Sequence, residues 1–136
     1  MLYRSATVTV SVDCPAKEVY DFLAEPLNLP TWTVAVSKIE HRQGNEWVAR
    51  TAKGEITFLY TPRNEYGILD YSMRRSGEED PGIVPARVFA NGDGAEITLT
   101  YYQRAGVSDE AFASEVEWIR TDLLTVKALL EVRGKR

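Results

Sequence analysis

One histidine and three tyrosines carry the side chains of this sequence that could most readily do chemistry. His41 is the only histidine, and its ordinary pKa lies near neutrality, so it could act as a general base or hydrogen-bond a ligand. Tyr60, Tyr71 and Tyr101 occupy strand-like segments in which they are expected to face inward. A buried phenol needs a hydrogen-bond partner, which another tyrosine, Thr51 or a ligand could supply.

Each candidate also has a purely structural interpretation. His41 could lie near a strand end, partly solvated, and the tyrosines could be ordinary core residues. Trp32 could be a lid aromatic that touches a ligand, or an anchor for the short helical segment around it. Cys14 is interpreted as a small packing residue rather than a nucleophile, since no histidine lies near it in the sequence. We therefore assign no catalytic residue.

The composition restricts the class of protein. The chain has 136 residues, 44% hydrophobic and 26% charged, as expected for one globular domain over residues 1–136. A net charge of −4 argues against nucleic acid as a partner, because phosphate binding needs a basic surface. With one histidine and one cysteine we expect no metal, no other cofactor and no internal disulfide. No apolar run approaches the ~18 residues of a membrane span, and the alternating N-terminus is unlike a signal peptide, so we expect a cytoplasmic protein.

The spacing of apolar residues predicts one strand, two helices, six strands and one long helix, in that order. Over residues 6–12, valines alternate with small hydroxyl residues, as in a strand with one buried face. Asp13 is placed to cap the helix that follows, and Ser108 to cap the final helix. The elements are expected at residues 6–12, 15–23, 25–32, 36–42, 46–52, 55–61, 66–75, 83–90, 95–103 and 108–132.

Strands joined by tight turns pair as an antiparallel meander, and the turns fix which side chains share a face. The predicted pairs are Trp47 with Tyr60, Phe58 with Tyr71, Tyr71 with Ala86, and Val88 with Ile97. The face gathered in this way consists of His41, Trp47, Phe58, Tyr60, Leu69, Tyr71, Met73, Val84, Val88, Ile97, Leu99 and Tyr101. Asp70 and Arg87 fall opposite each other on the polar face, as an exposed ion pair; a slip of one residue would turn them into the interior.

The final helix must cover the inner face of the sheet. Its apolar stripe consists of Phe112, Val116, Ile119, Leu123, Val126 and Leu130. One helix about 10 Å across cannot fill the concavity of a seven-stranded sheet, so part of this face is expected to form a pocket. An aromatic pocket with a few hydroxyls suits an apolar ligand with one or two polar groups. Glu115, Trp118 and Asp122 flank the stripe, and we interpret the two acids as solvated.

Several segments point to a known superfamily. They are Ala6–Val12, Pro15–Phe22, Leu29–Thr33, Asn91–Glu96 and Asp122–Glu131. Together they resemble the START-like (SRPBCC) superfamily, most closely its polyketide cyclase/dehydrase-like branch, and the tail resembles uncharacterised bacterial members. The resemblance implies an α+β helix-grip fold, with a seven-stranded curved antiparallel sheet around a long C-terminal helix and two short helices between the first two strands. It also implies a ligand cavity between sheet and helix, but no catalytic signature common to its carriers, aromatase/cyclases and co-chaperones.

We therefore expect a protein that binds a small hydrophobic molecule of lipid-, polyketide- or aromatic-like type. One alternative is a cyclase or dehydrase that uses His41, Tyr60 or Tyr71 for proton transfer. Another is a co-chaperone-like interaction module with an exposed apolar patch. Edge strands allow a monomer or a homodimer. The predicted ligand-binding residues are Trp32, His41, Trp47, Phe58, Tyr60, Tyr71, Met73, Val88, Leu99, Tyr101, Ile119 and Leu123.

Overall fold

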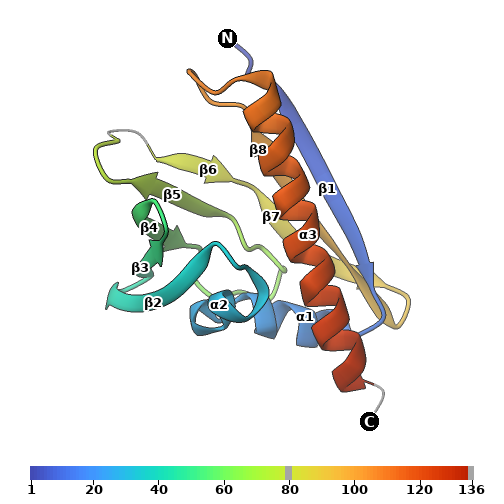
Figure 1. Cartoon of the computed structure of the whole chain (residues 1–136). Coiled ribbons are helices and arrows are strands. Elements are labelled where there is room, and N and C mark those ends of the chain that lie inside the picture. The colour runs from blue at the N-terminus through green and yellow to red at the C-terminus, as the bar shows by residue number, and fades with distance from the viewer. Residues whose placement is uncertain (79–80, 135–136) are drawn as a thin grey trace.

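The computed structural model describes residues 1–78 and 81–134, which fold into two antiparallel sheets and a long C-terminal helix. The elements are β1 (Ser5–Val12), α1 (Ala16–Leu23), η1 (Pro26–Asn28), α2 (Leu29–Trp32), β2 (Val36–Gln43), β3 (Glu46–Thr51), β4 (Gly54–Tyr60), β5 (Tyr71–Arg75), β6 (Gly82–Val84), β7 (Ala86–Asn91), β8 (Gly94–Tyr102) and α3 (Asp109–Gly134). The strand orders are β1-β8-β7 and β2-β3-β4-β5-β6. Figure 1 shows α3 running along β1, with α1 and α2 together at one end of the molecule.

The alternation of side chains in β1 builds one wall of the core. Val8, Val10 and Val12 are buried, whereas the serines and threonines between them face solvent. The strand pairs along its whole length with β8, where Val10 lies opposite Ile97. The buried valines belong to the same cluster as the apolar residues of α3, so this sheet and the helix enclose the main core.

The strand count differs from the sequence prediction at one proline. The predicted strand over residues 83–90 is divided at Pro85 into β6 and β7, which belong to different sheets. Proline has no backbone N–H for a sheet ladder, so the pairing partner changes there. The carbonyl of Pro85 still accepts a hydrogen bond from the Thr100 N–H at 2.9 Å. The described residues thus form eight strands rather than seven, but the predicted curved antiparallel sheet around a long helix is confirmed.

Of the four residue pairs predicted above, one is correct and the other three are shifted by two residues. Val88 lies opposite Ile97 as predicted. Trp47 lies opposite Phe58 rather than Tyr60. Phe58 lies opposite Met73 on its other side, rather than Tyr71. The turns are therefore placed one residue differently from the prediction. Because side chains alternate with a period of two, a shift of two residues leaves every side chain on its predicted face.

The caps predicted for the two longest helices differ in outcome. The Ser108 hydroxyl accepts a hydrogen bond from the Ala111 N–H at 3.1 Å, so the predicted cap of α3 is confirmed. The prediction for Asp13 is wrong, because Pro15 occupies the N-cap position of α1. Cys14 is buried, as predicted for a packing residue. Burial, together with a hydrogen bond to the Glu18 carboxylate, raises the pKa of its thiol to about 11.

Two hydrophobic clusters fill the interior. The larger lies between β1, β7, β8, α1 and α3, and it includes Val8, Ile97 and Val126. The smaller is built on β2, β3 and β4 and consists of Leu29, Val36, Ile39, Ala49 and Phe58. Several partly buried residues pack against both clusters, among them Trp32, Tyr71 and Met73. Residues that pack against both clusters therefore lie at the boundary between them.

Candidate ligand-binding cavity

A cavity of about 190 Å³ lies at the boundary between the two clusters. Its walls come from both sheets, from α1 and α2, and from the middle of α3. Most of the lining is aliphatic or aromatic, as in sites for small apolar ligands. The predicted site residues that line it are Trp32, Phe58, Tyr60, Tyr71, Met73, Leu99, Ile119 and Leu123.

Three aromatic rings from neighbouring strands form one wall of the cavity. Phe58 and Tyr60 of β4 stack with their centroids 5.6 Å apart, and Tyr71 of β5 lies 5.7 Å from Phe58 and 6.1 Å from Tyr60. Tyr60 and Tyr71 are also a directly opposed cross-strand pair. These spacings lie in the range in which aromatic rings attract one another, so the wall is a preformed surface.

The two phenols of this wall are hydrogen-bond donors rather than bases. Burial raises the pKa of Tyr60 and of Tyr71, and the neighbouring Tyr101 and Asp122 raise that of Tyr71 further. Both groups therefore stay protonated at neutral pH. Within residues 1–78 and 81–134, neither hydroxyl hydrogen-bonds another protein group. Each can donate its hydrogen bond to a bound molecule.

Asp122 places a carboxyl group in the apolar cavity. It was expected to be solvated, but it lines the cavity between Ile119 and Leu123 on the inward face of α3. Burial raises the pKa of Asp122 above its ordinary value, and a hydrogen bond with the Thr33 side chain offsets part of that rise. Thr33 is itself buried and also lines the cavity. The helical spacing of three residues from Ile119 was the signal in the sequence that could have identified this acid.

The charged groups around the cavity are all acidic. Glu25 and Asp122 line it, and no lysine, arginine or histidine does so in the part of the chain that the structure describes. Thr33 and Thr51 add hydroxyl groups. The cavity therefore combines apolar walls with hydrogen-bonding groups and a negative electrostatic bias.

The predicted site residues that lie outside the cavity are His41, Trp47, Val88 and Tyr101. His41 is exposed near the β2–β3 turn, where its Nε2 lies 2.9 Å from the Gly44 carbonyl oxygen and its ring lies 4.9 Å from that of Trp47. Val88 is buried in the larger cluster. Tyr101 stacks on Phe112, with centroids 6.1 Å apart, and burial together with the Glu115 carboxylate raises its pKa to about 12. All four residues lie on the predicted face of their strands, but at positions along the strands to which the cavity does not extend.

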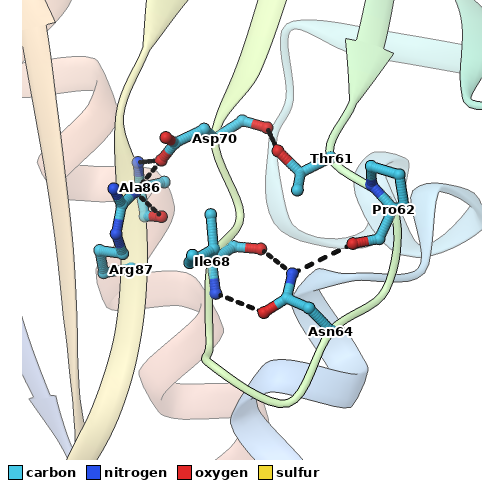
Figure 2. A network of polar contacts seen from close by, with 7 residues as sticks. All are labelled: Thr61, Pro62, Asn64, Ile68, Asp70, Ala86 and Arg87. Carbon is cyan, nitrogen blue, oxygen red and sulfur yellow. Dashed lines mark hydrogen bonds and ion pairs between the residues drawn. The ribbon is translucent and has the colours of Figure 1, made fainter.

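Asp70 links the segment that precedes β5 to β7 (Figure 2). Its carboxylate accepts a hydrogen bond from the Ala86 N–H at 2.8 Å and pairs with the Arg87 guanidinium. The predicted ion pair thus forms, and neither partner lines the cavity. The residues on either side of Asp70, Leu69 and Tyr71, both do. The pair therefore lies next to two cavity residues along the chain without lining the cavity itself.

Asn64 organises the loop that leads to Asp70 (Figure 2). Its amide nitrogen donates to the carbonyls of Pro62 and Ile68, at 3.0 and 2.9 Å, while its amide oxygen accepts from the Ile68 N–H at 3.1 Å. Its backbone N–H donates to the Tyr20 hydroxyl of α1 at 2.8 Å. The loop is thereby attached to α1, while Asp70 at its end attaches it to β7.

Comparisons with solved structures define the fold. The chain is similar to a START superfamily protein from Mycobacterium smegmatis, with 10% identity, a TM-score of 0.72 and coverage of 93% of this chain and 97% of that one. It is similar to the di-domain ARO/CYC BexL from the BE-7585A biosynthetic pathway, with 19% identity, a TM-score of 0.71 and coverage of 92% and 45%. The Aha1 dimer from Colwellia psychrerythraea gives 14% identity, a TM-score of 0.76 and coverage of 95% and 97%. The protein therefore has the START-like, polyketide cyclase-like fold.

Other comparisons and searches were negative. No protein-family model matches the chain, and no curated protein sequence matches it. In residues 1–78 and 81–134, no three His, Cys, Asp or Glu side chains are grouped closely enough to hold a metal ion. None of the helices in these two ranges has the length and apolar character needed to cross a membrane.

Proposed function

We propose that the protein binds a small hydrophobic molecule in the cavity between its sheets and α3. The observation that carries the proposal is the cavity itself, because its walls are almost entirely apolar and its few polar groups point to an orienting role. The START-superfamily and ARO/CYC structural neighbours support a fold suited to such ligands. The aromatic wall of Phe58, Tyr60 and Tyr71 favours ring-containing ligands over extended chains.

The size of the cavity supports a ligand of one or two rings. Apolar cavities of about 150 Å³ in proteins bind benzene. The present cavity is about 190 Å³, which leaves room for one ring with a substituent or for a compact fused pair. A long acyl chain or a polycyclic polyketide would require the walls to move apart.

The positions of the titratable groups favour binding over proton-transfer catalysis. The predicted base, His41, lies outside the cavity, and the two phenols of the aromatic wall have raised pKa values. The titratable groups that line the cavity and could accept a proton are the carboxylates of Asp122 and Glu25. A cyclase or dehydrase reaction stays a hypothesis that would depend on one of these acids.

A pair of tryptophan substitutions on one strand tests the proposal. Ile56 of β4 lines the cavity, whereas Leu59 on the same strand is 54% exposed and does not. Naphthalene and indole, both neutral, are titrated into the purified protein and followed by calorimetry or NMR. We expect Ile56→Trp to abolish binding and Leu59→Trp to preserve it. Equal binding by both variants, or none by the wild-type chain, would contradict the proposal.

A further inference from the structure

The cavity has an uneven distribution of charge that bears on which ligand it selects. Asp122 makes no ion pair with a lysine, arginine or histidine among the described residues. Its polar neighbours at the cavity are Thr33 and Tyr71. Thr33 hydrogen-bonds the carboxyl group, and the charge of Asp122 raises the pKa of Tyr71. Glu25, the second acid of the lining, cannot neutralise it. An ionised Asp122 therefore lacks a compensating cation from the protein.

The aromatic wall lines the same cavity as this acid. Tyr71 belongs to the wall and also interacts electrostatically with the Asp122 carboxylate. The rings of Phe58 and Tyr60 lie within 6.1 Å of that of Tyr71. Aromatic faces attract cations, and a desolvated cation–π contact is stronger than one at the surface. The cavity therefore combines a carboxyl group with aromatic rings, which are the two kinds of group that recognise an ammonium ion.

The same distribution disfavours anionic ligands. A carboxylate or phosphate ligand would bring a negative charge into an apolar space that already contains Asp122, with no basic side chain in the lining to receive it. A neutral alcohol would gain hydrogen bonds to Thr33 or to a phenol but would leave the charge of Asp122 uncompensated. A protonated amine would satisfy both the charge and the hydrogen-bonding capacity of the acid.

We propose that the cavity selects a protonated amine carried on an apolar body of one or two rings, with Asp122 as its counter-ion and the rings of Phe58, Tyr60 and Tyr71 as its cation-binding surface. This inference rests on the proposed function, since it names the ligand class of the same cavity. In the bound arrangement the ammonium group lies between α3 and the aromatic wall. The apolar body then occupies the space lined by Leu99, Ile119 and Leu123.

Three probes of similar shape but different charge test the inference on the wild-type chain. They are 2-phenylethylamine, 2-phenylethanol and 3-phenylpropanoate, titrated at pH 7 and followed by calorimetry or NMR. A charge-assisted hydrogen bond corresponds to a factor of at least about ten in affinity, so we expect the amine to bind at least about tenfold more tightly than the alcohol. We expect no measurable binding of the anion.

Two charge-removing substitutions on α3 separate direct contact from general electrostatic attraction. Asp122→Asn removes the acid inside the cavity, and Glu117→Gln removes an exposed acid that pairs with Arg120. We expect Asp122→Asn to lose about tenfold or more in amine affinity while its affinity for the alcohol changes less than about twofold. Glu117→Gln should retain wild-type affinity for both. Asp122→Ser serves as a second variant if the asparagine variant folds poorly by circular dichroism.

The outcomes distinguish failure of this inference from failure of the proposed function. Binding of the alcohol with no preference for the amine, or the same amine affinity in Asp122→Asn as in the wild type, would overturn the amine assignment and leave hydrophobic binding intact. Preferential binding of the anion would overturn it as well. Absence of binding by all three probes, together with no binding of naphthalene and indole, would overturn both proposals.

Discussion

The Asp122 carboxyl group is held where its ionised form is poorly solvated. Its neighbours on α3, Ile119 and Leu123, are apolar, and the group that hydrogen-bonds it, Thr33, is uncharged. An ionised carboxylate in such surroundings destabilises the folded state relative to the unfolded chain.

This placement predicts how stability depends on pH. The folded-state pKa of Asp122 is raised above its unfolded value, so the folded protein binds the proton more tightly. The free energy of unfolding must therefore fall as the pH rises from about 4, the unfolded pKa, through the higher folded pKa. We expect Asp122→Asn to be more stable than the wild type at pH 8, with an advantage that vanishes as the pH is lowered to about 4.

Urea unfolding at a series of pH values measures this difference. Glu117→Gln provides the control, because its exposed carboxylate makes only a surface ion pair with Arg120. A stability difference between Asp122→Asn and the wild type that does not change with pH would show that Asp122 titrates normally.

The candidate site shows what residue patterns in the sequence can and cannot predict. Alternation within β4 and β5 correctly predicts that Tyr60 and Tyr71 face inward, because side-chain direction in a strand depends only on parity. Parity does not tell how far along a strand the cavity extends, and His41 therefore lies beyond its end. Asp122 is missed for a different reason: a charged residue flanking an apolar stripe is usually solvated, and only packing against α2 and the sheet encloses it.

At the scale of elements, the loop between β4 and β5 depends on close contact with β7. The Gly67 carbonyl accepts a hydrogen bond from the Val88 N–H at 2.9 Å, and Gly67 has φ of +73°. A Cβ atom at this position would overlap the Val88 carbonyl oxygen. Only glycine therefore allows both the left-handed backbone and the approach of the two chains.

A matched pair of alanine substitutions separates these two requirements. Gly44 also has a positive φ, of +51°, but a Cβ there would meet nothing within 4 Å. We expect Gly44→Ala to lower the free energy of unfolding by about 1–2 kcal/mol, the conformational cost alone. Gly67→Ala should lower it by clearly more, since the loop must also move away from β7. Denaturant unfolding compares the two, and equal losses would mean that the contact with Val88 adds nothing.

Asp70 joins the same loop to β7 through two different partners. Its carboxylate accepts from the Ala86 N–H and pairs with Arg87, whose side chain is partly exposed. We expect Asp70→Ala to cost about 1–3 kcal/mol, because the Ala86 N–H loses its acceptor. Arg87→Ala removes the ion pair and the hydrogen bond that the guanidinium donates to the Ala86 carbonyl at 3.0 Å. Because the side chain is partly exposed, this substitution should cost less than Asp70→Ala, about 1 kcal/mol. Thermal or urea unfolding measures both, and a larger loss for Arg87→Ala would reverse the assigned roles.

Sequence patterns predict the elements better than their connections. The alternation in β1 and the cap at Ser108 are predicted correctly, because both depend on a few neighbouring residues. Pro85 is a local signal that the strand is interrupted, but no local pattern encodes which neighbouring strands β6 and β7 then pair with. The two-residue shifts in register also lie outside what local patterns can predict. Moving the centre of a turn such as that at Gly54 by one residue shifts the strand pairing by two residues, so every side chain stays on the same face.

At the scale of the whole molecule, the two hydrophobic clusters are unequal. The larger cluster is covered by α3 and contains β1 and β8, which pair along the whole length of β1. The smaller contains five buried residues, on α2 and on strands β2 to β4. Structural units with fewer buried apolar contacts open at lower free energy than the global unfolding. The cavity lies between these two clusters, so we expect a ligand to reach it by local opening of the smaller one.

Amide hydrogen exchange, followed residue by residue in NMR spectra, tests this division. We expect the amides of β2 and β3 to exchange through local opening, faster than those of β1 and β8, whose slowest amides should report global unfolding. Saturation with a ligand that contacts α2, β4 and α3 should slow exchange in β2 to β4 more than in β1, because the ligand binds only the closed arrangement. The Ile56→Trp variant, in which the cavity is filled, should show no such effect of added ligand. Uniform protection of both sheets, or a ligand effect confined to β1 and β8, would mean that the two halves open as one unit and that the ligand gains access by another path.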